Sequence, residues 1–94
     1  MIQKVGFELS ISGRDDGTLE AAYIRLSRSK VAKTKEIVED ILLADYNASG
    51  DLIGIEILAP VKLSQLTKLV DERKRRQFRR FVQHSAPHEL VLTS

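Results

Sequence analysis

The chain contains no cysteine in its 94 residues. It therefore cannot form a disulfide, a thiolate nucleophile or a cysteine-bound metal site, and the lack of disulfides fits a reducing cytoplasm. No apolar run approaches the roughly 20 residues that a membrane-spanning helix needs. Residues Met1 to Val5 also lack the long apolar core of a signal peptide. We therefore expect a cytoplasmic protein that makes no membrane contact.

The charges are distributed unevenly along the chain. Residues 1–60 hold 7 Lys/Arg and 10 Asp/Glu, whereas residues 61–94 hold 8 and 3. The hydrophobic content of 43% is ordinary for a globular protein. At this length we expect a single domain with an acidic sheet core over 1–60 and a basic helix and tail over 61–94.

Alternation of apolar and polar residues predicts strands in the first part of the chain. The pattern runs over Phe7–Ile11 and again over Ala22–Leu26. Between them, Gly13–Gly17 is rich in Asp and Gly and predicts a turn. Val31–Val38 has β-branched residues but also charges, a combination that is typical of an edge strand with a bulge. A helix over Lys33–Leu43 is the competing interpretation.

The most informative fragment predicts a β-hairpin. Ile41–Tyr46 and Leu52–Leu58 form its strands, and Asn47–Gly50 suits a type I turn with Gly50 in the left-handed region. The second strand places three isoleucines on one face: Ile53, Ile55 and Ile57. Pro60 ends this sheet because it cannot donate a ladder hydrogen bond.

Gly54 sits inside the second strand of this hairpin. Glycine in a strand commonly marks a bulge or the close approach of another element. The expected neighbour is the C-terminal helix or an aromatic ring, such as that of Tyr23 or Tyr46.

From Leu63 to about Val82 the apolar period becomes helical, with Ser64 as a plausible N-cap. The apolar stripe consists of Leu63, Leu66, Val70, Phe78 and Phe81, and it is interrupted by Lys74 and Gln77. Pro87 should end the helix, and Glu89–Ser94 either adds a strand or stays loose.

These patterns predict an α+β fold, in which a four- to five-stranded antiparallel β-meander precedes one long C-terminal amphipathic helix. One helix covers only one face of the sheet, so we expect a symmetric homodimer. Phe78 and Phe81 are candidate dimer contacts, although they could instead pack on the sheet of the same chain.

The segment 73–80 has six basic residues in eight. Its arginines are the candidate contacts to a partner or to nucleic acid: Arg73, Arg75, Arg76, Arg79 and Arg80. Such clusters bind phosphates, but they also form solvated helix faces or pair with acidic protein surfaces. No helix-turn-helix spacing, zinc ligand set or RNA-binding aromatic motif supports specific readout.

Little in the sequence indicates catalysis or a bound cofactor. His84 and His88 have the spacing of a metal pair, but Pro87 lies between them and no nearby Cys or Asp completes a site. There is no glycine-rich phosphate loop and no catalytic triad in a suitable context. We expect a protein that is not an enzyme and holds no metal or cofactor.

Three motifs resemble those of domain-of-unknown-function family 2283, a family of small prokaryotic proteins. They are Ala22–Leu26 (A-Y-I-R-L), Asp45-Tyr46, and Gly50–Leu58 (G-D-L-I-G-I-E-I-L). The resemblance covers roughly residues 7–60. It implies a small antiparallel sheet, a prokaryotic cytoplasmic setting and no established activity. Some members are thought to be encoded beside small RNase-like toxins and to act as antitoxin-type partners. We therefore expect a protein-interaction module of an antitoxin-like kind, with non-specific nucleic-acid binding as the alternative.

Overall fold

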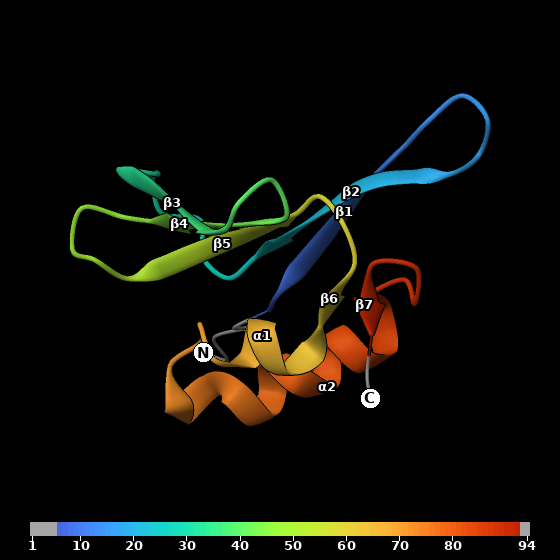
Figure 1. Ribbon diagram of the computed structural model, residues 1–94. Coiled ribbons are helices and arrows are strands. Elements are labelled where there is room, and N and C mark those ends of the chain that lie inside the picture. The colour runs from blue at the N-terminus through green and yellow to red at the C-terminus, as the bar shows by residue number, and fades with distance from the viewer. Residues whose placement is uncertain (1–5, 93–94) are drawn as a thin grey trace.

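The computed structural model describes residues 6–92. Its sheet strands are β1 (Glu8–Gly13), β2 (Leu19–Arg25), β3 (Lys33–Val38), β4 (Leu42–Tyr46) and β5 (Leu52–Ile57). They are followed by β6 (Val61–Lys62), α1 (Leu63–Thr67), the 3-10 helix η1 (Glu72–Lys74), α2 (Arg75–Ser85) and β7 (Val91–Leu92). The helices lie together on one side of the sheet (Figure 1).

The five strands form one antiparallel sheet in the order β1-β2-β5-β4-β3. The five-stranded antiparallel prediction is confirmed, but the meander is wrong because β2 pairs with β5 and not with β3. β5 carries the apolar residues that are best buried between two neighbours, so it lies in the centre. The charged strand β3 is left at an edge.

β3 has the edge position and the bulge that its charges predicted. Its register with β4 shifts between Glu36 and Val38. The helix considered over Lys33–Leu43 is wrong: the chain turns between β3 and β4, where Asp40 adopts a positive φ of 60°. Aspartate is among the few residues that tolerate this conformation.

The β4–β5 hairpin follows its prediction closely. Asn47 Oδ1 accepts hydrogen bonds from the backbone N–H groups of Ser49 at 3.0 Å and Asp51 at 2.9 Å. Gly50 has a φ of 86°, which is the left-handed conformation expected for it. The turn therefore fixes the register of the two central strands.

The core lies between this sheet and the helices. Ile53, Ile55 and Ile57 are 2%, 0% and 0% exposed, as the alternation predicted. Ile55 pairs with Ile24 on one side and Ala44 on the other. The helical layer contributes Leu63, Leu66, Val70, Phe78 and Val82 to the same core.

The long helix predicted from Leu63 to about Val82 is wrong, because the chain breaks into α1 and a second helical stretch, η1–α2. Asp71 starts the second stretch: its carboxylate accepts from the backbone N–H of Arg73 at 3.1 Å. The N-cap of α1 is Lys62 rather than Ser64. The break explains the interrupted stripe, since Lys74 and the neighbouring polar residues are exposed instead of facing the core.

The end of the chain returns to the fold. α2 ends at Ser85, before Pro87 as predicted, and Ala86 is extended. The strand alternative for the tail is confirmed, because β7 pairs in parallel with β6. The last two residues of the predicted tail, 93 and 94, lie outside the residues that the structure describes. No helix of residues 6–92 has the length and apolar character to span a lipid bilayer.

Candidate functional site

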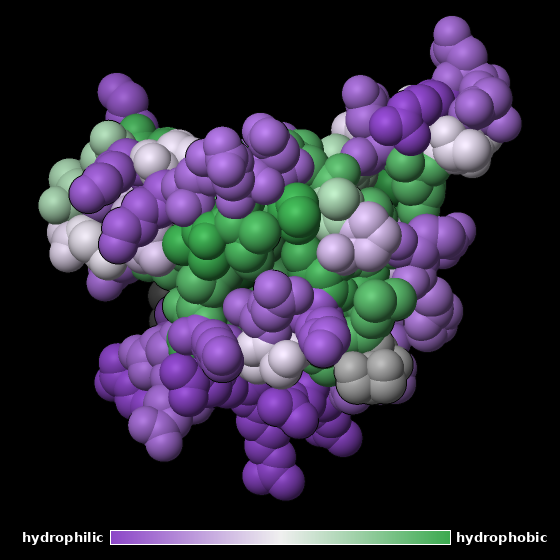
Figure 2. All heavy atoms as spheres, viewed as in Figure 1, coloured by the Kyte–Doolittle hydropathy of each residue, from purple (hydrophilic) through white to green (hydrophobic). Residues whose placement is uncertain are grey.

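The outer side of α2 carries three arginines at helical spacing. Arg76, Arg79 and Arg80 are exposed, whereas Phe78 and Val82 on the inner side are 0% and 1% exposed. We call these three arginines the basic surface. The ion pairs between described residues are Arg28–Glu8 and Arg73–Asp71, so the basic surface takes part in neither. Figure 2 shows hydrophilic side chains along this side of the molecule.

The other two candidate arginines are engaged within the chain. Arg73 pairs with Asp71 at 2.9 Å, and this hydrogen bond lowers the pKa of Asp71 and raises the pKa of Arg73. Arg75 donates from Nε to the carbonyl oxygens of Thr67 at 2.9 Å and Val70 at 2.8 Å. It therefore binds carbonyl groups at the end of α1, a structural role that helical spacing alone did not reveal.

The two candidate dimer phenylalanines lie differently. Phe78 is 0% exposed and packs edge-on against Phe7, with ring centroids 5.6 Å apart. Phe81 is half-buried and lies 5.6 Å from the same ring. Phe78 therefore packs within its own chain, which is one of the two alternatives predicted for it. Because its side chain is fully buried, it cannot contact a second copy of the protein.

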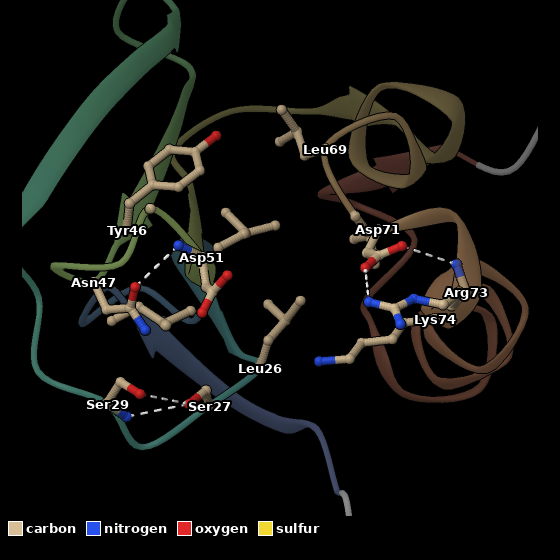
Figure 3. Close-up of a pocket in the computed structure, with 14 residues that line it drawn as sticks. Leu26, Ser27, Ser29, Tyr46, Asn47, Asp51, Leu69, Asp71, Arg73 and Lys74 are labelled. Atoms are coloured by element: carbon tan, nitrogen blue, oxygen red, sulfur yellow. Dashed lines mark hydrogen bonds and ion pairs between the residues drawn. The ribbon is translucent and has the colours of Figure 1, made fainter.

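A cleft of about 510 Å³ separates the turn end of the sheet from the η1 end of the helical layer. Its floor is apolar and its rim is polar (Figure 3). Lys74 extends into it from the helical side, and Asp51 lies on the turn side (Figure 3). Asp71 and Arg73 pair with each other on the rim.

Several polar groups that line this cleft are engaged in hydrogen bonds within the chain. Its described lining residues include Ser27, Ser29 and Asn47 but no histidine to act as a base. Ser27 accepts from the backbone N–H of Ser29 at 3.2 Å, and Asn47 is occupied by the turn. No group of three potential metal-ligating side chains occurs within residues 6–92.

The face of the sheet away from the helices carries a polar network. The register aligns its side chains in two cross-strand rows, which are Tyr23, Glu56, Leu43 and Glu36, and Arg25, Gly54, Asp45 and Thr34. We call these eight residues the open face. No helix among the described residues covers it (Figure 1).

Asp45 is the centre of this network. Its Oδ2 accepts from the Tyr23 hydroxyl at 2.8 Å, and its Oδ1 accepts from the Thr34 hydroxyl at 2.6 Å. Burial and the hydrogen bond to Asp45 raise the pKa of Tyr23 to about 12. The network thus joins side chains from strands β2, β4 and β3 across the face.

Gly54 lies beneath the Tyr23 ring. A Cβ atom at this position would collide with the Tyr23 hydroxyl and ring. Of the neighbours that the sequence predicted for Gly54, the one observed is therefore the Tyr23 ring. The hydrogen bonds to Asp45 were not predicted. Gly54 was the sequence signal for a nearby aromatic ring. No comparable signal indicated Asp45 and Thr34, which only the strand register brings next to the Tyr23 hydroxyl.

Residues 16–59 match the model of the family described as a protein of unknown function (DUF2283). This segment of the chain is therefore similar to DUF2283. The match spans β2 to β5 and begins later than the resemblance over residues 7–60, so β1 lies outside it. Neither the curated proteins nor the solved structures contain a match to the chain.

The open face lies entirely within the DUF2283 segment. It brings together residues from the separate motifs that carried the resemblance: Tyr23 from the first, Asp45 from the second, and Gly54 and Glu56 from the third. The basic surface and the cleft's helical side belong to residues outside the family match. The chain therefore combines four strands that match the DUF2283 model with a basic helical layer beyond the matched segment.

Replacing Gly54 with alanine should destabilise the fold by about 1–3 kcal/mol, because the new methyl group must displace the Tyr23 ring. The displaced Tyr23 hydroxyl would also lose its hydrogen bond to Asp45. Urea unfolding of Gly54→Ala, Tyr23→Ala and the double variant measures this coupling. In the Tyr23→Ala background, adding Gly54→Ala should cost little. An equal cost in both backgrounds would contradict the contact.

Proposed function

We propose that this protein is a small non-enzymatic interaction module, which docks onto an acidic protein surface through the basic surface of α2. Arg76 is separated from Arg79 and Arg80 by three and four residues, so the three like charges are neighbours on the helix. Such neighbours repel and weaken a helix by a few tenths of a kcal/mol per pair. A partner that supplies carboxylates would relieve this repulsion.

The observation that carries the proposal is the anchoring of α2. Phe78 and Val82 are buried, so the helix is held in place and its outer arginines are presented on a firm support. A helix that is already held in place loses less conformational entropy on binding than a segment that must first fold. This arrangement favours recognition of a partner surface.

Further parts of the proposal come from the sequence. A prokaryotic cytoplasmic setting and an antitoxin-like role toward a small toxin-like protein rest on the family resemblance, and association of the chain with a second copy rests on the uncovered face of the sheet. The DUF2283 match agrees with the resemblance but names no activity. Co-expression with the product of the neighbouring gene, followed by co-purification, tests the toxin-like partner.

Non-specific nucleic-acid binding is the second candidate, because three exposed arginines on one helix face also suit a phosphate backbone. Fluorescence anisotropy with labelled duplex and single-stranded oligonucleotides at two salt concentrations separates the candidates. A variant with Arg76, Arg79 and Arg80 replaced by Gln removes the basic surface. Lys30, Lys33 and Lys35 replaced by Gln form the matched control, since they are exposed and remove the same charge.

We expect weak oligonucleotide binding at physiological salt, with little difference between the arginine variant and the lysine control. Submicromolar binding that the arginine variant alone abolishes would overturn the ranking. Its dependence on salt would then have a log–log slope of about −0.9 per phosphate neutralised on duplex DNA. Arg75 is left unchanged because it supports the end of α1.

A further inference from the structure

The open face has an excess of carboxylates on its β3–β4–β5 half. Glu36 is exposed, and Asp45 and Glu56 are half-buried. We call these three residues the acidic patch. The one cation on the open face, Arg25, lies opposite Glu8 of β1, and Glu8 also pairs with Arg28 at 3.1 Å. The carboxylates of the acidic patch have no ion-pair partner among the described residues.

The acidic patch is partly preorganised and has an apolar centre. Asp45 is held by two hydroxyl groups, which are neutral donors and leave its negative charge in place. Half-buried Leu43 lies between Glu56 and Glu36 in the same cross-strand row. An apolar centre with charged neighbours is typical of a protein-binding surface.

The acidic patch and the basic surface match in charge and scale. Each has three like charges. Glu36 and Glu56 lie two strands apart, which is about 10 Å, and Arg76 and Arg80 are separated by about 6 Å along the helix. Arginine side chains are long and flexible enough to bridge the difference of about 4 Å between these two spacings. The patch lies on the side of the sheet away from the helices, so it cannot reach the basic surface of its own chain (Figure 1).

We propose that the basic surface of one copy docks on the acidic patch of a second copy. This inference rests on the proposed function and names its partner. Because the two surfaces face opposite sides of the molecule, one copy cannot engage both surfaces of the same neighbour (Figure 1). The contact is therefore heterologous, and it replaces the symmetric contact expected from the sequence. Each bound pair leaves one basic surface and one acidic patch unoccupied. Association therefore continues with rising concentration and weakens with salt.

Sedimentation velocity at low and high salt tests the contact with charge reversals. The helix variant carries Arg76→Glu and Arg80→Glu, and the sheet variant carries Glu36→Lys and Glu56→Lys. The matched control carries Lys30→Glu and Lys33→Glu, at exposed positions that belong to neither surface. The helix variant and the control change the wild-type net charge of +2 by the same amount. Circular dichroism melts confirm that each variant folds.

The wild type and the control should associate at low salt and dissociate at high salt. Each reversal alone should weaken association by about tenfold or more, since two ion pairs become repulsive. A mixture of the helix and sheet variants should associate again, because each supplies the charge that the other needs.

Three results would overturn the inference: a wild type that stays monomeric at low salt, a helix variant that associates like the wild type, or a mixture that stays dissociated. None of these results alone removes the proposed function, which fails instead if the oligonucleotide assay finds arginine-dependent, submicromolar binding.

Discussion

Replacing Ile55 with aspartate is expected to cost several kcal/mol and to leave little folded protein, because it puts an unpaired charge in apolar surroundings. Ile55 is 0% exposed in the central strand, between Ile24 and Ala44. A domain with an ordinary stability of 5–15 kcal/mol loses a large part of it by such a change. Thermal melting followed by circular dichroism measures the loss.

The matched control is Leu58→Asp, since Leu58 follows the same strand but is 38% exposed. It adds the same charge and should lower the melting temperature far less. A cooperative melt of Ile55→Asp near the temperature of the parent would show that the strand register described for β5 is wrong.

Replacing Phe78 with alanine should cost about 3–5 kcal/mol, the usual range for removal of a buried aromatic ring. Phe78 is 0% exposed and joins α2 to the sheet core and to Phe7. Chemical unfolding of the variant should show a large decrease in the free energy of unfolding. The decrease should not depend on protein concentration, because the ring packs within one chain.

Phe81→Ala is the control, because Phe81 contacts the same Phe7 ring but is only half-buried. Its loss should be clearly smaller. Equal losses for both variants, or a loss for Phe78→Ala that grows with dilution, would point to a ring shared between subunits.

Much of the sheet could be predicted from the sequence because its signals are local. The alternation of Ile53, Ile55 and Ile57, the Asn47–Gly50 turn and the charges of β3 each act over a few residues. The strand order could not be predicted in the same way. Pairing of β2 with β5 joins segments on either side of the β3–β4 hairpin, so it depends on non-local packing.

The helical layer was predicted less well, because both its break and the role of Arg75 were missed. Lys74 and Gln77 interrupted the apolar stripe, and Asp71 is a good cap, so local signals for a break were present. The contact of Arg75 with the end of α1 spans five to eight residues and forms only after the turn closes. For this reason the sequence grouped Arg75 with the outward arginines.

On the open face, too, local features could be predicted from the sequence and non-local contacts could not. Gly54 predicted a close neighbour from a single residue, and Tyr23 was among the expected ones. The network of Tyr23, Thr34 and Asp45 was missed, since its members lie 22 and 11 residues apart and meet only through strand register. Local patterns indicated which side chains share a face, and pairing determined which of them touch.

A dilution series of two-dimensional ¹H–¹⁵N spectra at low salt tests most directly whether the basic surface and the acidic patch meet. With rising concentration, we expect the signals of Arg76, Arg79 and Arg80 and those of Glu36, Leu43 and Glu56 to move together, and salt to reverse the movement. Signals around the cleft, such as that of Asn47, should stay in place. Movement confined to the cleft, or to one of the two surfaces alone, would contradict the account.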